Sequence, residues 1–191
     1  MRYSKTHKQE TREKLLQSSR VVAKRNGFGT TGVDALMAAV GLTGGAFYSH
    51  FDSKEDLFAS IIELEMEQSA RMLAGDEGSQ PDHIAQLLKI YLSTYHATHP
   101  GEGCALPALG PEIARSSPEI RTRVERAVKH VHSRWTDRLG GDKDAAWAFV
   151  AQCVGSILIA RVVESEQTQQ EILSSSRRFM LQSSPHLKDA K

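Results

Sequence analysis

The chain has 191 residues, 40% of them hydrophobic and 25% charged, and a formal net charge of +1. These proportions are typical of a soluble globular protein. The start of the chain lacks the apolar segment of a signal peptide. The most apolar stretch, residues 145–160, is shorter than the roughly 20 apolar residues that span a bilayer. We therefore expect a cytoplasmic protein, and its two cysteines fit a reducing compartment.

Positive charge gathers near the N-terminus. Residues 1–25 contain eight basic side chains and two acidic ones, which gives this segment a net charge of +6. A basic segment that runs into a helix suits contact with phosphate groups. A solvated helix face explains the same charge, so the pattern leaves both interpretations open.

The first two predicted helices lie close together in the chain. A helical pattern over residues 8–26 ends at Gly27, a usual residue for a helix C-terminus. Thr31 and Asp34 form the pattern of a capping box ahead of a short second helix, although Asp is a weaker partner than Glu in that role. Apolar residues then recur at helical spacing and predict one buried face.

A glycine separates this short helix from a third one. Gly41 breaks the helical pattern, and Thr43 is placed to cap a helix over residues 44–51. Two short helices joined by a tight turn with glycine are typical of a helix-turn-helix unit.

The remaining patterns are helical throughout, with no strand-like alternation. A polar linker over residues 75–81 follows the fourth predicted helix, and Pro118 stands at a favourable first position of a later helix. The fold expected is all-α, with about nine helices. Beyond the first three, they are predicted near residues 53–73, 84–95, 105–115, 118–139, 143–164 and 168–183.

One stretch carries a family resemblance. The segment from Gly27 to Phe58, and above all its run Gly45-Ala46-Phe47-Tyr48 with Phe51 and Ser53-Lys54-Glu55, closely resembles the DNA-binding domain of the TetR family. The resemblance covers about residues 12–62. It implies a regulator without catalytic activity or cofactor, most often a repressor. A small-molecule or thiol-reactive effector would release such a repressor from a pseudo-palindromic operator in double-stranded DNA.

The resemblance also implies how the chain is divided and assembled. Residues 1–52 would form the DNA-binding helix-turn-helix domain, 53–74 a connecting helix, and 75–191 the effector-binding and dimerisation domain. The last two helices would join two copies into a homodimer through apolar stripes, for which the candidates are Phe149, Val150, Val154, Ile157, Leu158, Val162, Ile172, Leu173, Phe179 and Met180.

Eight residues are expected to contact DNA. A recognition helix enters the major groove with its N-terminal end, which favours outward-facing positions near the start of the third helix, and helix starts also bind phosphates. The candidates are Thr31, Thr43, Gly44, Gly45, Tyr48, Ser49, His50 and Lys54. At Gly44 the chain departs from the family, which often has Lys or Arg there. Residues 26–53 contain no Lys or Arg, so base readout is expected from Thr43, Tyr48 and the backbone.

The effector site is expected among the central helices. Aromatic and polar-tipped candidates are Tyr91, Tyr95, His99, Trp135 and Phe149, each of which a simple core position also explains. Cys104 is a sharper candidate, because it stands at the start of a short helix, where unpaired N–H groups stabilise a thiolate. Its surroundings resemble those of NemR-like repressors of the family. A small buried residue remains the alternative, and Cys153 is expected to be inert core.

Other functions remain as alternatives. His96, His99 and Cys104 have spacing that suits zinc and would make the chain a metal-responsive regulator, although a fourth ligand is missing from the pattern. A hydrolase with Cys104 as nucleophile and His99 or His130 as base is less favoured, because no glycine-rich phosphate loop, nucleophile elbow or carboxylate pair is present. A helical adaptor that never touches DNA is the third class.

Overall fold

The computed structural model describes residues 5–75 and 83–183. Within these residues the chain forms α-helices, one short 3-10 helix and no strand, so the all-α prediction is confirmed. In chain order the elements are α1 (Lys5–Asn26), α2 (Val33–Ala38), η1 (Gly44–Ser49), α3 (Lys54–Ala74), α4 (His83–Tyr91), α5 (Thr94–Thr98), α6 (Leu106–Ala114), α7 (Pro118–Arg138), α8 (Lys143–Val162) and α9 (Glu166–Ser183).

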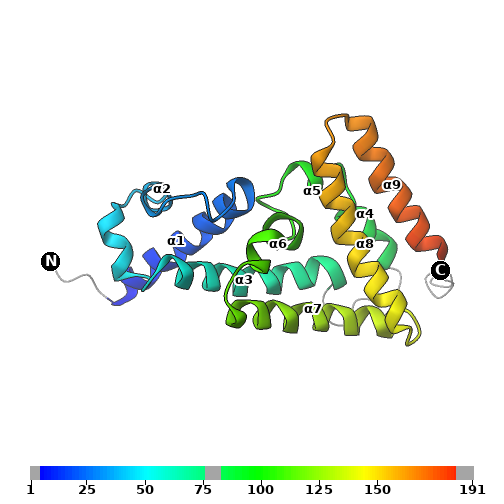
Figure 1. Cartoon of the computed structure of the whole chain (residues 1–191), viewed down its shortest axis with the longest axis horizontal. Helices are drawn as coiled ribbons and strands as arrows, with labels where there is room; N and C mark the ends of the chain where they lie inside the picture. The colour runs from blue at the N-terminus through cyan, green and yellow to red at the C-terminus, as the bar shows by residue number, and fades with distance from the viewer. Residues whose placement is uncertain (1–4, 76–82, 184–191) are drawn as a thin grey trace.

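The helices form an elongated molecule with distinct ends (Figure 1). One end consists of α2, η1 and the beginning of α1, and the other of the antiparallel pair α8 and α9. The long helices α3 and α7 lie side by side between these ends, and α6 contacts α1, α7 and α8. The helix α3 therefore joins the predicted DNA-binding end to the rest of the molecule.

Two apolar clusters stabilise this arrangement. The first is centred on α1, α2, η1 and α3, with Leu15, Phe47 and Ile61 among its fully buried side chains. It also includes Leu109 of α6 and Val124 of α7, so it extends well beyond residue 52. The second cluster lies among α4, α7, α8 and α9, around Trp135 and the fully buried core positions Leu88, Cys153 and Ile157 of neighbouring helices.

Two local predictions outside η1 were wrong. The N-cap of α2 is Gly32, which has no side chain to bond the helix, because the hydroxyl of Thr31 instead donates to the carbonyl oxygen of Gly27 at 2.8 Å. The single helix expected near residues 84–95 is two helices, because Ser93 caps α5 and its Oγ accepts a hydrogen bond from the His96 N–H at 3.2 Å. The predicted linker lies outside the described residues, apart from Gly75.

The helix α8 is long and apolar enough to cross a membrane, with a mean hydropathy of 1.6. The same length and composition occur in core helices of globular proteins. Here Phe149, Cys153 and Ile157 pack into the second cluster, and α7 and α9 cover two sides of the helix. Burial among neighbouring helices accounts for these three apolar side chains, whereas Leu158, Ile159 and Val162 of α8 are exposed.

Candidate DNA-binding surface

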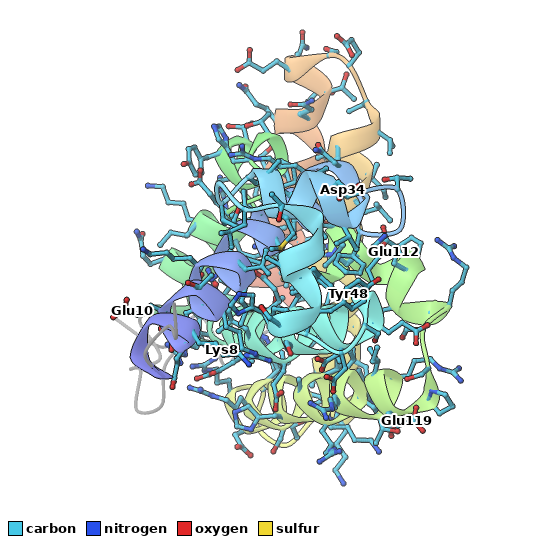
Figure 2. The ribbon with its side chains drawn as sticks, turned by 90° about the vertical axis from the view of Figure 1, so that its left-hand side faces the viewer. Lys8, Glu10, Asp34, Tyr48, Glu112 and Glu119 are labelled. Carbon is cyan, nitrogen blue, oxygen red and sulfur yellow. The ribbon has the colours of Figure 1, made fainter. Side chains whose placement is uncertain are left out.

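Two buried phenylalanines fix the orientation of η1. Phe47 is completely buried, and its ring stacks on that of Phe51 with centroids 5.9 Å apart. The adjacent Tyr48 makes an edge contact with Phe47 but is 70% exposed. Figure 2 looks onto the end of the molecule formed by α2 and η1, where Tyr48 is labelled. The anchored core thus presents the Tyr48 phenol to solvent at the tip of the molecule.

The turn before η1 depends on one glycine. Gly41 has a φ of +73°, a left-handed conformation that residues with a Cβ rarely adopt. The turn leaves Thr43 extended and exposed at the N-cap of η1, where its side chain makes no capping hydrogen bond. Thr43 thus stands at the N-cap position, as expected, but the expected capping hydrogen bond is absent. The third element is a 3-10 helix that ends at Ser49. The Thr43 hydroxyl is exposed next to η1.

Gly44 and Gly45, the glycine pair at the start of η1, have different surroundings. A Cβ placed on Gly44 would lie only 1.8 Å from Oδ1 of Asp34, so the carboxylate of α2 occupies the space of a side chain. A Cβ on Gly45 would meet nothing within 4 Å. A side chain at position 44 would therefore require the Asp34 side chain to move, whereas the protein itself places no steric demand on Gly45.

The other predicted contacts are engaged within the protein. The Nζ of Lys54 donates to the carbonyl oxygen of Gly29 at 3.1 Å and lies 4.9 Å from the centroid of the Phe28 ring. Ser49 is exposed, but its hydroxyl donates to the carbonyl oxygen of Ala46 at 2.7 Å. His50 and Thr31 are half-buried. Five of the eight predicted residues lie on η1 or next to its start, and among the eight it is mainly Thr43, Gly45 and Tyr48 that are exposed without such contacts.

The basic N-terminal segment is only partly a surface feature. The guanidinium of Arg12 lies 4.4 Å from the centroid of the Phe51 ring and donates to Ser60 at 3.3 Å. Arg20 and Lys24 also point inward, toward α3. For these three residues neither phosphate contact nor a solvated helix face applies, because α3 supplies partners for them. Lys8, labelled in Figure 2, and Lys14 are exposed on α1.

A buried carboxylate joins α1 to α3. Glu65 bonds the Arg20 guanidinium at 2.6 Å and the Lys24 ammonium at 2.9 Å, and the side chains of Lys24 and Glu65 are completely buried. Lys24 also donates to the carbonyl oxygen of Gly103 at 3.0 Å. Burial lowers the pKa of Lys24, and the adjacent Glu65 opposes that shift. Residues of α1, of α3 and of the loop before α6, which are far apart in the sequence, therefore meet at this buried ion pair.

A second carboxylate links α6 to the loop after α1. Glu112 accepts hydrogen bonds from the backbone N–H groups of Phe28, at 2.9 and 3.1 Å, and of Gly29, at 3.0 Å. This contact is not predictable from the sequence, because no local pattern relates residues more than 80 positions apart. The Glu65 site had a readable signal, since this charged residue follows Ile61 by one helical turn on an otherwise apolar face.

Cys104 and His96 belong to the protein interior. Cys104 is fully buried, and burial raises the pKa of its thiol, so the predicted thiolate at a helix start is wrong. The Cys104 N–H donates to Nε2 of His96 at 2.9 Å, which leaves Nδ1 of the ring to donate to the Tyr91 carbonyl oxygen at 2.7 Å. Both nitrogens of His96 are thus engaged, and the described residues contain no cluster of three metal-binding side chains. This geometry contradicts the zinc-site alternative. Cys153 is buried, as predicted.

The predicted effector residues divide into two groups. Tyr91, Cys104, Trp135 and Phe149 lie in the second apolar cluster, where the indole N–H of Trp135 donates to the Leu73 carbonyl oxygen at 2.8 Å. Tyr95 and His99 are exposed, and their rings stack with centroids 4.0 Å apart. These two line a surface groove of about 450 Å³ together with His96. The six candidates therefore do not surround one cavity.

Comparison with known proteins assigns the N-terminal part of the chain. The family model of bacterial regulatory proteins of the tetR family matches residues 15–61. An HTH-type transcriptional regulator in the lacX 3' region of Lactococcus lactis subsp. lactis is 22% identical over 166 residues, or 81% of this chain and 85% of that protein. The HTH-type transcriptional regulator AcrR of Shigella flexneri is 38% identical over 63 residues, or 33% of this chain and 29% of that protein.

Solved structures agree on the fold. A TetR transcriptional regulator from Chloroflexus aurantiacus superposes with a TM-score of 0.75 at 23% identity, over 93% of this chain and 97% of its own. The reduced form of Escherichia coli NemR gives 0.70 at 20% identity, over 89% and 95%. With the exposed tip at η1, the family match across α1 to α3 identifies residues 15–61 as a DNA-binding helix-turn-helix of the tetR type, and the solved structures show that the whole chain has the fold of TetR regulators.

Proposed function

We propose that the chain is a cytoplasmic repressor that binds a pseudo-palindromic operator as a homodimer and is released by a small-molecule effector. The observation that carries this proposal is the surface strip from Thr43 to Tyr48, exposed at one tip and held there by buried Phe47. We assign residues 1–52 to DNA binding, 53–74 to the connecting helix and 75–191 to effector binding and dimerisation.

In this proposal, hydroxyl and backbone groups rather than Lys or Arg side chains read the bases. The major groove is about 12 Å wide and admits a helix end, and Tyr and Thr hydroxyls bond to phosphates or base edges there. Thr43 and Tyr48 are exposed at the two ends of η1, and Gly45 between them lets the backbone approach the duplex closely. Affinity would come from Lys8 and Lys14, which remain exposed on α1.

Exposed apolar side chains on α8 and α9 support the dimer. Leu158, Ile159 and Val162 on α8 and Phe179 on α9 are all between 47% and 75% exposed. Such side chains at one end of the molecule favour burial against a second copy in a four-helix bundle. Five of the ten residues predicted for this surface, including Phe149 and Met180, instead pack within the monomer.

Two contacts support coupling between the DNA-binding and the effector-binding parts of the chain. Lys24 bonds Gly103, and Glu112 bonds the Phe28 and Gly29 amides, so α1 and its loop are tied directly to the segment around α6. A ligand that binds better to a conformer with these ties displaced would shift the dimer away from the DNA-competent state. Because both cysteines are buried, a reversible small molecule is favoured over a thiol-reactive one.

Selection of bound sequences from a random DNA pool tests this function. We expect a pseudo-palindromic site that the dimer binds and that Tyr48→Ala binds at least about tenfold more weakly. Tyr95→Ala is the matched control, because Tyr95 is also an exposed tyrosine but lies on α5. Recovery of no common sequence, or equal losses in both variants, would refute the assigned surface.

A further inference from the structure

A groove between α3 and α7 has no role in the proposed DNA contacts or in the predicted effector set. Its volume is about 640 Å³, within the 300–1,000 Å³ range of small-molecule sites. Met66 and Ala70 of α3 and Ala127 of α7 contribute apolar surface to it. The two helices that line it, α3 and α7, have 21 residues each and lie side by side (Figure 1).

The rim of this groove has excess positive charge. Four arginines line it, one from α3 and three from α7, against two glutamates of α3. Arg123 bonds Glu63 at 2.9 Å, and Arg71 bonds Glu67. Arg126 and Arg134 add further positive charge along the same side of α7, spaced so that they flank Ala127 and His130. A ligand with a negative head group would complement this rim.

Apolar interior lies directly behind the groove. A small cavity of only about 10 Å³ lies there between the packed helices. It is lined by apolar side chains that include Leu73, Val131 and Val150. It shares Met66, Ala70 and Ala127 with the groove itself. The two alanines, Ala70 and Ala127, lie along the line where α3 and α7 meet, which we call the seam. Their small side chains leave little steric obstruction between the charged rim and this interior. An apolar chain that enters along the seam therefore contacts apolar surface.

We propose that this groove binds a small amphipathic anion, a single apolar chain with a carboxylate or phosphate head. Guanidinium groups bind both head groups through paired hydrogen bonds, and the apolar seam would accept the chain. A bare inorganic anion would leave the apolar seam uncovered, and a neutral amphipath would leave the arginines without a new partner. The ligand class thus follows from the arginines on the rim together with the apolar seam between the two helices.

The site has a direct route to the DNA-binding end, and this step rests on the proposed function. Met66, in the groove, is adjacent in sequence to Glu65, which bonds Arg20 and Lys24 of α1. A chain inserted between α3 and α7 would displace α3 relative to α1 at that ion pair. The amphipathic anion would then be the effector that releases DNA.

Titration calorimetry of the full-length chain with dodecanoate, below its micelle concentration, tests the site. We expect saturable binding, comparable binding of dodecyl phosphate, and binding of dodecanol that is weaker by about tenfold or more. Arg126→Glu should weaken dodecanoate binding by a similar factor. Arg121→Glu is the matched control, since Arg121 is an exposed arginine of α7 outside the groove, and it should leave the affinity unchanged.

The outcomes separate this site from the proposed function. Absence of dodecanoate binding, equal affinity for dodecanol, or equal effects of Arg126→Glu and Arg121→Glu would overturn the proposal, provided that circular dichroism shows both variants folded. Operator binding is measured separately without ligand. A chain that binds an operator but no dodecanoate loses only this inference. One that binds dodecanoate through Arg126 but no DNA keeps the site and loses the repressor function.

Discussion

At Gly44 the DNA-binding tip has a carboxylate where the family often has a base-reading cation. The Asp34 carboxylate fills the space beside the Gly44 α-carbon, and the sequence between residues 26 and 53 supplies no Lys or Arg to offset it. Negative charge near phosphates weakens association, so this tip should bind DNA with a small electrostatic component. Specificity would then depend more on Thr43 and Tyr48 than in a cation-rich helix.

The substitution Gly44→Lys tests this electrostatic account. The flexible Asp34 side chain can turn away from a new Cβ, and the added ammonium is expected to raise affinity for all DNA sequences at low salt. The slope of log K against log salt should become steeper by about 1 for each subunit that gains a phosphate contact. Gly45→Lys, where a Cβ has open space, is the comparison. A slope unchanged in both variants contradicts the placement of this strip against DNA.

His96 makes the stability of the fold depend on pH. Burial is the main cause that lowers its pKa to about 4, whereas the unfolded chain protonates histidine near 6.5. The unfolded state therefore binds more protons between these values, so stability is complete above pH 6.5 and is lost as the pH falls toward 4. The loss attributable to His96 between pH 7.5 and pH 5 is about 2 kcal/mol.

Urea unfolding at these two pH values measures the effect. His96→Gln cannot gain a charge and should lose most of this pH dependence, although it is less stable at pH 7.5. His99→Gln should retain it, because His99 is exposed on the same short segment. A wild-type free energy of unfolding that changes no more than that of His96→Gln would show that His96 is not buried as described.

Between the helices α1 and α3, the Glu65 ion pair is a completely buried charged contact. Removing one partner of a buried pair leaves an uncompensated charge and costs about 3–5 kcal/mol. Glu65→Gln should therefore lower the free energy of unfolding by about this amount. Glu67→Gln, on the same helix and exposed in its pair with Arg71, should cost less than about 1 kcal/mol. Similar small losses in both variants would contradict a buried pair.

Most helix boundaries were predictable because they depend on neighbouring residues. Gly27 ends α1, Ser53 caps α3 and Pro118 begins α7, as their local chemistry indicates. The break at Ser93 and the absence of a capping box at Thr31 were not predicted. The Thr31 hydroxyl donates back to the Gly27 carbonyl oxygen, whereas the Ser93 hydroxyl donates to the Ile90 carbonyl oxygen and accepts from the His96 N–H. Local sequence does not determine which backbone groups such a hydroxyl bonds.

The candidate site was predictable to a lesser extent. The exposure of Tyr48 followed from the apolar spacing of its neighbours, but the inward turn of Arg20 and Lys24 depended on a partner some 40 residues away. Cys104 shows the same limit. Its place near a helix start suggested reactivity, whereas the packing of Tyr91, His96 and Ser69 around it made it core.

For the whole molecule, dimerisation through α8 and α9 makes a separate prediction. Val162 is 75% exposed, and Val162→Glu would place a charge in the proposed four-helix interface. Light scattering should show a dimer for the wild-type chain and a monomer, or a much weaker dimer, for the variant. Ile90→Glu is the control, because Ile90 is an exposed apolar residue of α4. A dimer equally stable in both variants would place the interface elsewhere.

The arrangement of the two DNA-binding tips follows from that dimer. Each tip lies at the end of the molecule away from the α8–α9 pair, so two copies joined there could present both η1 helices to one duplex (Figure 1). Half-sites one helical turn apart, roughly 34–36 Å, are the spacing that successive major grooves require. The spacing of the selected operator therefore reports on the dimer as well as on the tip.

The most direct measurement is fluorescence anisotropy with the selected operator and a scrambled duplex of equal length, at one salt concentration. We expect the wild-type dimer to bind the operator at least about 10³-fold more tightly than the scrambled duplex, and Tyr48→Ala to remove most of this difference. Equal affinity for the two duplexes, or a preference that survives in Tyr48→Ala, would contradict sequence-specific binding through the η1 tip.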